Sequence, residues 1–110
     1  MIEEKDTGIK IYLDKIPLIR EVLSFARMGI VPAGTYRNRD FRTQYLIGAD
    51  KIERALMDIL FDPQTSGGLL IAVKKEEAEG LLSRLHDKGE KEASLIGEFT
   101  GEHKGKIDLS

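Results

Sequence analysis

The sequence predicts a single α+β domain, an α/β sandwich in which helices cover a mixed β-sheet. Short apolar segments with the period of a strand alternate with segments that have the period of a helix, which is typical of helices layered on a sheet. The length of 110 residues favours one domain, 1–110, with one modest core. Hydrophobic residues make up 41% of the chain and charged residues 33%, which is enough to build and cover that core.

The first half of the chain predicts one strand and two helices. Residues 9–13 alternate apolar and polar side chains, the period of a half-buried strand. The first helix is expected over residues 14–29, because aspartate and proline suit its start and glycine its end. Asp50 and Glu53 have the spacing of a capping box, and they precede the apolar period of a second helix at residues 52–60.

The second half predicts a central strand, a helix and two further strands. Residues 69–73 form a continuous apolar run between turn residues, which favours a strand buried on both faces. Residues 78–85 place apolar side chains on one helical face, and Gly89 ends that helix. Strands are expected at 93–99 and 107–109. A right-handed crossover would make 69–73 and 93–99 parallel neighbours in the sheet.

Composition excludes several classes of function. The net charge of −2 provides no general field for nucleic acid or an anionic membrane surface. The absence of cysteine removes disulfides, thiolate metal sites and cysteine nucleophiles. His86 and His103 are both expected at the surface in structural roles, so no metal ligand is predicted. The acidic residues 1–6 do not resemble a signal peptide, so we expect a soluble, cytoplasmic protein without a membrane partner.

The turn at residues 62–68 is the most distinctive local feature. Thr65 and Ser66 offer hydroxyls, and Gly67 and Gly68 allow backbone N–H groups to approach a ligand such as a phosphate. Phosphate-binding loops usually run from strand to helix, whereas this one is expected to run from helix to strand. The alternative is therefore a helix end followed by a tight turn with no ligand.

Residues 30–48 show no clear period and predict a long loop. Loops of this length in compact domains often bind ligands or act as lids. Arg37, Arg39 and Arg42 alternate with aromatic residues there, and Asn38 adds an amide. Arginine side chains suit phosphate groups through their paired donors. The alternative is a surface loop whose aromatic side chains dock on the core while its arginines stay solvated.

The run DPQTSGGLL at residues 62–70 resembles a signature of the selenophosphate synthetase (selenide, water dikinase) family. Four further segments fit that family in order: IP at 16–17 before a helix, GIVPAGT at 29–35 with Arg37 and Asn38, LF at 60–61 and IGE at 96–98. The resemblance covers nearly the whole chain as a C-terminal domain. It implies the C-terminal domain fold of the aminoimidazole ribonucleotide synthetase superfamily, which the hydrogenase-maturation carbamoyl dehydratase and thiamine-monophosphate kinase share.

The resemblance implies a larger enzyme that makes selenophosphate, AMP and phosphate from ATP, selenide and water. Magnesium and ATP are its cofactors, and its members are cytoplasmic homodimers. The family's N-terminal ATP-binding and catalytic domain, with its essential Cys or selenocysteine and Lys, has no counterpart in this sequence. The chain alone is therefore expected to be inactive, to bind no cofactor and to begin, at residues 1–6, with the tail of a helix.

The resemblance also suggests which residues face the cleft between the two domains. They are expected to shape or cover the phosphate and selenide site, and none is expected to be a nucleophile, general base or metal ligand. These candidates are Thr65, Ser66, Gly67 and Gly68, followed by Arg37 and Asn38. Two alternatives remain: a sister ATP-dependent enzyme of the superfamily, or a noncatalytic module that binds a partner through an exposed apolar patch.

Overall fold

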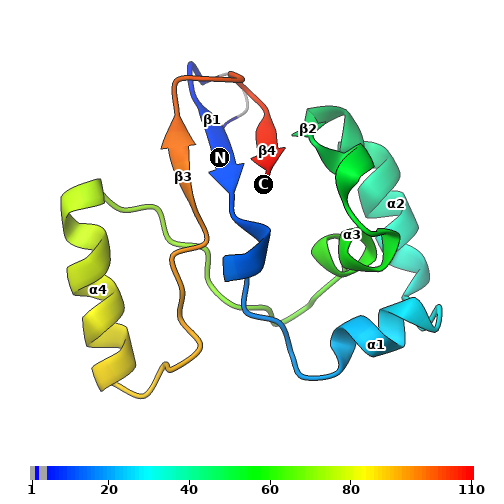
Figure 1. Cartoon of the computed structure of the whole chain (residues 1–110), viewed down its shortest axis with the longest axis horizontal. Helices are drawn as coiled ribbons and strands as arrows, with labels where there is room; N and C mark the ends of the chain where they lie inside the picture. Colours follow the sequence, from blue (N-terminus) through cyan, green and yellow to red (C-terminus); the bar gives the residue numbers. More distant parts are fainter. Residues whose placement is uncertain (1, 3–4) are drawn as a thin grey trace.

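A mixed four-stranded sheet stands at the centre of the computed structural model, which describes residue 2 and residues 5–110 (Figure 1). The strands are β1 (Gly8–Ile11), β2 (Leu46–Ile47), β3 (Gly97–Thr100) and β4 (Ile107–Leu109). Their order is β2-β4-β1-β3, in which β1 pairs parallel with β4 and antiparallel with β3, and β2 pairs parallel with β4. The predicted α+β class is therefore confirmed.

Four α-helices lie beside the two edges of this sheet among the described residues (Figure 1). They are α1 (Val22–Arg27), α2 (Ala33–Arg42), α3 (Arg54–Leu60) and α4 (Lys75–Asp87). Figure 1 shows α1, α2 and α3 grouped beside β2, and α4 apart from them beside β3. Both α1 and α2 pack against α3. None of the helices in the described part of the chain combines the length and the apolar character that a membrane crossing requires.

Close backbone approach holds β1 against β3. A Cβ atom at Gly97 would fall on the carbonyl oxygen of Lys10, so only glycine fits at this position. Beyond the paired residues, the backbone N–H of Tyr12 donates to the Ile96 carbonyl at 2.8 Å. The Tyr12 hydroxyl donates to Glu98 Oε1 at 2.5 Å, and this bond to a carboxylate raises the pKa of Tyr12.

The elements with a clear one-sided period are confirmed. The predicted strands at 9–13 and 107–109 correspond to β1 and β4, and the predicted helices at 52–60 and 78–85 correspond to α3 and α4. Gly89 follows α4 with a φ of 105°, in the left-handed region that favours glycine as a helix stop.

The apolar run at residues 69–73 is not a strand, so the prediction of a central buried strand is wrong. It forms an irregular connection between α3 and α4, in which Leu69 is 90% exposed and Ile71 51%. The sheet explains this: its two central positions are taken by β4 and β1, so no central position remains for residues 69–73. The predicted parallel pairing of 69–73 with 93–99 is also wrong, because β3 begins only at Gly97 and runs antiparallel to β1.

The predicted loop at residues 30–48 is also wrong, because it contains α2, a 3₁₀ turn at Thr43–Tyr45 and β2. The buried side of α2 is polar: Thr35 is fully buried and Arg39, one turn later, is half-buried. Phe41, in contrast, is 66% exposed. A helix that buries polar side chains and exposes an aromatic ring has no apolar period from which it could be predicted.

The helix expected over 14–29 and the capping box expected before the helix at 52–60 need correction. A 3₁₀ turn at Leu13–Lys15 comes first, and α1 starts only at Val22, after Glu21 adopts a left-handed φ of 67°. The capping box is absent, since Glu53 precedes α3 without a capping hydrogen bond. Asp50 lies in a separate 3₁₀ turn, Ala49–Lys51.

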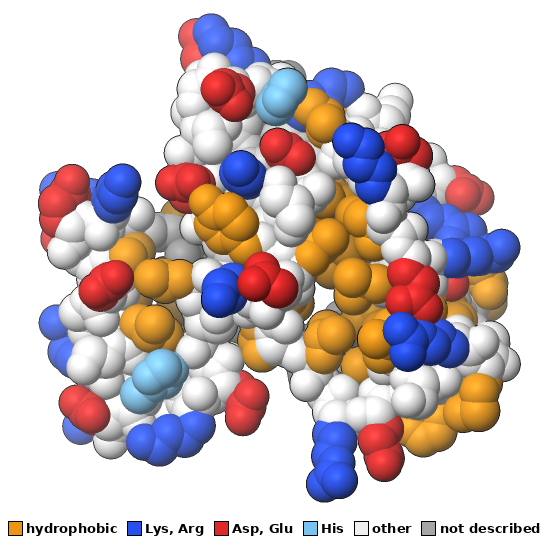
Figure 2. Space-filling model, viewed as in Figure 1, with side chains coloured by type: hydrophobic (Ala, Val, Ile, Leu, Met, Phe, Trp, Pro, Cys, Tyr) orange, Lys and Arg blue, Asp and Glu red, His pale blue; other side chains and the backbone are white. Residues whose placement is uncertain are grey.

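The buried side chains of the described residues gather mainly on α3. Ala55 and Met57 are buried there with Asp58, and Thr35 of α2 and Ile2 are buried as well. The expected helix tail at residues 1–6 falls partly on residues 1, 3 and 4, which lie outside the described residues; Lys5 and Asp6 form a bend. The buried centre is thus small, and Figure 2 shows hydrophobic side chains at the surface over α4 and over the helices of the other side.

Candidate functional site

The turn at residues 62–68 follows α3 and lies at the surface. Thr65, Ser66, Gly67 and Gly68 are all exposed, and within the described residues neither hydroxyl has a hydrogen-bond partner. A Cβ atom at Gly67 would lie 2.5 Å from the side-chain oxygen of Gln64, so that side chain lies close over the glycine. The turn therefore presents free hydroxyls to solvent and an uncovered backbone at Gly68, where a Cβ atom would meet nothing within 4 Å.

The N-terminal half of α2 holds the start of this turn. Asn38 Nδ2 donates to the carbonyl oxygen of Phe61 at 3.0 Å. One turn earlier on α2, Gly34 faces Pro63, and a Cβ atom there would lie 3.0 Å from the proline Cγ. The structure thus places Asn38 beside the segment that carries the other candidates. Arg37 is exposed on α2 next to Asn38.

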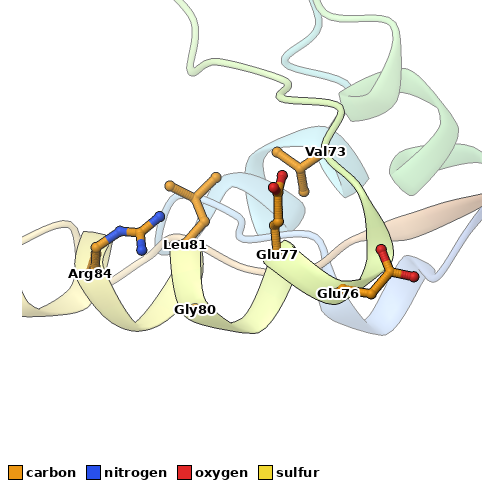
Figure 3. A pocket seen from close by; sticks show the side chains of 6 residues that line it. All are labelled: Val73, Glu76, Glu77, Gly80, Leu81 and Arg84. Carbon is orange, nitrogen blue, oxygen red and sulfur yellow. The ribbon is translucent and has the colours of Figure 1, made fainter.

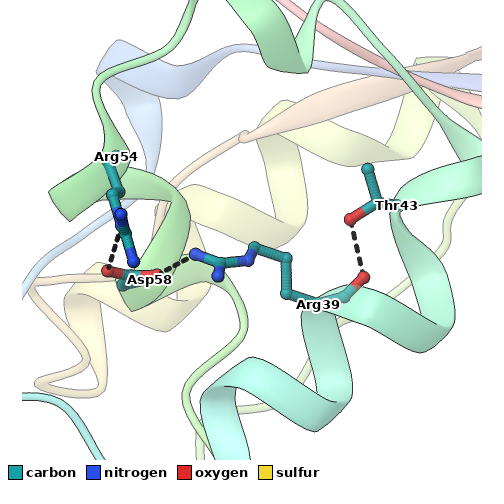
Figure 4. Close-up of polar contacts among 4 residues, drawn as sticks. All are labelled: Arg39, Thr43, Arg54 and Asp58. Atoms are coloured by element: carbon teal, nitrogen blue, oxygen red, sulfur yellow. Dashed lines mark hydrogen bonds and ion pairs between the residues drawn. The ribbon is translucent and has the colours of Figure 1, made fainter.

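A buried carboxylate, which the sequence reasoning missed, joins α2 to α3. Asp58 is 6% exposed, and its Oδ1 accepts a hydrogen bond from Arg39 Nη1 at 2.5 Å. Arg54 approaches the same carboxylate from another side, with its Nε 4.0 Å from Oδ2 (Figure 4). The Arg39 guanidinium also lies 5.3 Å from the centre of the Tyr36 ring. These contacts fix α2 against α3 and thereby set the place from which the turn departs.

A second ion pair joins α1 to the start of α3. Arg27 donates to both carboxylate oxygens of Glu53, from Nε at 2.7 Å and from Nη2 at 2.9 Å. This bidentate hydrogen bond lowers the pKa of Glu53 and raises the pKa of Arg27. Glu53, predicted to cap a helix, therefore serves as an ionic link between helices.

Two cavities lie away from the predicted site residues. One, of about 350 Å³, lies among α1, α2 and α3, and we call it the α1–α3 cavity; Arg27, Tyr36, Glu53 and Asp58 are among its lining residues. The other, of about 470 Å³, lies along α4. Figure 3 shows Val73 and Leu81 at this second cavity; its lining residues are Val73, Glu76, Glu77, Gly80, Leu81 and Arg84. Neither cavity contains a predicted candidate residue.

The surroundings of the turn do not provide an acid–base pair within the described residues. In the part of the chain that the structure describes, no histidine or carboxylate is hydrogen-bonded to Thr65 or Ser66, and no three His, Asp or Glu side chains come together as a metal site would require. His86, expected at the surface, is half-buried, and its Nε2 lies 2.8 Å from the Ala93 carbonyl oxygen. His103 is exposed in the last turn, as predicted.

Comparison with known proteins confirms the resemblance noted in the sequence. Three relatives are each described as "Selenide, water dikinase". The protein of Pelobacter propionicus is 42% identical over 107 residues, which is 97% of this chain and 31% of the relative. That of Clostridioides difficile is 42% identical over 97 residues, covering 88% of this chain and 28% of the relative. That of Caldanaerobacter subterraneus is 45% identical over 96 residues, covering 83% and 27%.

This chain therefore spans less than a third of the length of these curated relatives. The whole chain, residues 1–110, also matches the model of a family described as "AIR synthase related protein, C-terminal domain". A match over the whole chain agrees with the mixed sheet and flanking helices described above. The chain belongs to the family of AIR synthase related protein C-terminal domains.

Proposed function

We propose that this chain is the C-terminal domain of a selenide, water dikinase, which makes selenophosphate, AMP and phosphate from ATP, selenide and water. One observation carries the proposal: a relative with that name is 42% identical over 97% of this chain. The complete protein would act as a homodimer in the cytoplasm. Its N-terminal domain would hold ATP, magnesium and the reactive Cys or selenocysteine with its Lys.

Within this chain, the turn after α3 would face the reacting groups. The exposed hydroxyls of Thr65 and Ser66 can donate hydrogen bonds to phosphate oxygens, and Gly68 leaves room for a close approach, whereas the Gln64 side chain lies over Gly67. Asn38 would act as a positioning residue through its bond to Phe61. Arg37 would add positive charge nearby. Because the described residues bring no three acidic or His side chains together, we derive no step through magnesium from them.

The exposed apolar run at 69–73 supports a role as one part of a larger protein. Leu69, Leu70 and Ile71 are 90%, 59% and 51% exposed, and Val73 continues the apolar surface into the cavity on α4. Contiguous apolar patches on soluble proteins usually mark interaction sites. We propose that the remaining two-thirds of a protein of the relatives' length covers this surface. A noncatalytic partner-binding module would use the same surface.

A chimaera distinguishes these functions. This chain replaces the matching segment of the Pelobacter propionicus relative, and selenide-dependent AMP formation is measured for the chimaera and for the chain alone. The chimaera is expected to be active and the chain alone inactive. A chimaera that is folded by circular dichroism but inactive would contradict the proposal and favour a sister enzyme or a binding module.

Variants of the chimaera test the turn itself. Ser66→Ala is expected to lower kcat/KM by about tenfold or more, since removing one preorganised donor to a developing charge commonly costs about 10²-fold or more. Gly67→Ala is expected to lower kcat/KM as well, because its Cβ would lie 2.5 Å from the Gln64 side-chain oxygen and would shift the turn. Ser83→Ala, at an exposed position of α4, is the matched control. Activity and stability unchanged in both turn variants would leave the turn with a structural role alone.

A further inference from the structure

The α1–α3 cavity has a chemical character that the proposed function does not use. Its lining combines charged side chains with Val31, Ala55 and Tyr36. Its volume of about 350 Å³ is near the lower end of the range of roughly 300–1,000 Å³ found for small-molecule sites. The cavity can therefore accommodate a small molecule with both a charged and an apolar part.

The two carboxylates at this cavity are already neutralised. Both oxygens of Glu53 accept hydrogen bonds from Arg27, at 2.7 and 2.9 Å. Oδ1 of Asp58 accepts a hydrogen bond from Arg39 at 2.5 Å, and Asp58 is almost fully buried beneath it. Neither carboxylate is thus free to bind a cation, because each already has a guanidinium as its partner.

Arg54 adds a third guanidinium to these two carboxylates. Its Nε is 4.0 Å from Asp58 Oδ2, which is too long for a hydrogen bond, and it makes no other polar contact within the described residues. The Arg54 side chain is 76% exposed and lines the cavity. The cluster therefore carries one positive charge in excess, and the hydrogen-bond donors of Arg54 are available to a ligand.

We propose that the α1–α3 cavity binds a small organic anion. Its carboxylate or phosphate group pairs with Arg54, because the guanidinium offers parallel N–H donors that match either oxyanion. Its apolar body lies against Tyr36 and Val31. The Tyr36 ring is held for this contact by Arg39, whose guanidinium lies 5.3 Å from the ring centre and is itself fixed by Asp58. This site is separate from the turn at 62–68, so it does not depend on the proposed function.

Titrations followed by NMR test the site on the full chain. Phosphate, phenyl phosphate and benzoate are each added to ¹⁵N-labelled protein, and amide and arginine side-chain shifts are recorded. Saturable shifts are expected at the residues of the α1–α3 cavity. Phenyl phosphate and benzoate are expected to bind several-fold more tightly than inorganic phosphate, because only they contact the apolar wall.

Variants of Arg54 identify the anion-binding group. Arg54→Gln is expected to weaken phenyl phosphate binding about tenfold or more, because it removes the charge and the paired N–H donors that hold the oxyanion. Arg54→Lys keeps the charge and is expected to retain part of the affinity. Arg84→Gln, at an exposed arginine on α4, is the matched control and is expected to bind as the unsubstituted protein does.

Three results would overturn the proposal. They are the absence of a saturable shift with any probe, equal affinity of the Arg54→Gln variant and the unsubstituted protein, and a loss of affinity in Arg84→Gln as large as that in Arg54→Gln. Inorganic phosphate that binds as tightly as phenyl phosphate would overturn the organic class of the ligand. Arg54→Gln is expected to fold, because the side chain is exposed and makes only a long contact. Circular dichroism of both Arg54 variants checks this.

Discussion

Asp58 offers the most direct test of how α2 is held against α3. Its carboxylate is buried, and the two arginines around it differ in distance and exposure: 2.5 Å and 23% for Arg39, and 4.0 Å and 76% for Arg54. Only the shorter distance is that of a hydrogen bond. Arg39 should therefore contribute far more than Arg54 to the free energy of unfolding.

The size of the effect follows from this geometry. Removing one partner of a fully buried ion pair costs about 3–5 kcal/mol, whereas a charge-assisted hydrogen bond contributes about 1.5–3 kcal/mol. Arg39 retains some contact with solvent, so water can partly solvate its freed guanidinium. We therefore expect Asp58→Ala to lower the free energy of unfolding by about 2–3 kcal/mol, in the upper part of the lower range.

A double-mutant cycle separates the two arginines. Asp58→Ala, Arg39→Ala, Arg54→Ala and the two double variants are unfolded in urea at fixed pH and low ionic strength, followed by circular dichroism. The coupling energy should be about 1.5–3 kcal/mol for Asp58 with Arg39. For Asp58 with Arg54 it should be below about 0.5 kcal/mol, because the two are 4.0 Å apart in an i, i+4 pair whose arginine is 76% exposed. Arg84→Ala on α4 is the matched control.

Two outcomes would refute this reasoning. One is an Arg54 coupling as large as the Arg39 coupling, and the other is an Arg39 coupling below about 0.5 kcal/mol, the range of exposed pairs. If Asp58→Ala does not fold, Asp58→Asn keeps the volume of the side chain and removes only its charge. The same cycle then measures the charge-dependent part of the coupling.

Three further predictions use the same urea assay. Gly97→Ala should lower the free energy of unfolding by about 1–3 kcal/mol, because its Cβ would fall on the backbone of β1. Gly68→Ala is the control, because its Cβ would meet nothing within 4 Å. Equal effects of the two substitutions would contradict the close approach at Gly97. Arg27 lowers the pKa of Glu53 in the folded protein. The stabilisation that this ion pair contributes is therefore present above the ordinary glutamate pKa of about 4.3, and it is lost as pH falls through the lowered pKa. Glu53→Gln should remove this pH dependence, and an unchanged profile would exclude the ion pair as its cause. Leu69→Ser should change stability by less than about 0.5 kcal/mol at this 90% exposed position, and a larger loss would mean that the side chain is packed.

The parts of the fold that could be predicted are those with one apolar side. In α4, the side chains of Ala78, Leu81 and Leu85 recur at helical spacing, and all three are half-buried while their neighbours Glu77 and Glu79 are exposed. Burial here follows hydrophobicity, so the sequence period and the structure agree. β1 was predicted from its alternation and pairs with β3 and β4, although its burial does not alternate: Lys10 is half-buried like Ile9 and Ile11.

The failures come from positions where burial does not follow hydrophobicity. In α2 the side turned toward α3 carries Thr35 and Arg39, and the charge of Arg39 is met by Asp58, which lies 19 positions further along the chain. Such a pairing leaves no local period. At 69–73 the apolar run predicted a central strand, but the sheet is completed by β4, a strand of three residues at the end of the chain. Pairing between distant segments decides both cases.

The candidate site was predictable as a set of residues and not as a geometry. The DPQTSGGLL run carried the resemblance that grouped residues 62–68 with Arg37 and Asn38. The contact between Asn38 and Phe61 joins positions 23 residues apart and has no signature in spacing. Asp58 was missed because it lies in an apolar helix period as an isolated carboxylate. An aspartate within such a period, with arginines elsewhere, is the signal that could have indicated a buried ion pair.

The packing of α3 connects the structural tests to the chemical one. Two ion pairs fix α3, one from Arg39 to Asp58 and one from Arg27 to Glu53, and the turn leaves directly from its C-terminal end. Asp58→Ala should therefore lower both the stability and the activity of the chimaera, because it releases α3, the helix that positions the turn. Ser66→Ala should lower activity alone, since the exposed hydroxyl makes no contact within the described residues. Those two results together would assign ligand contact to the turn and the support of the turn to α3.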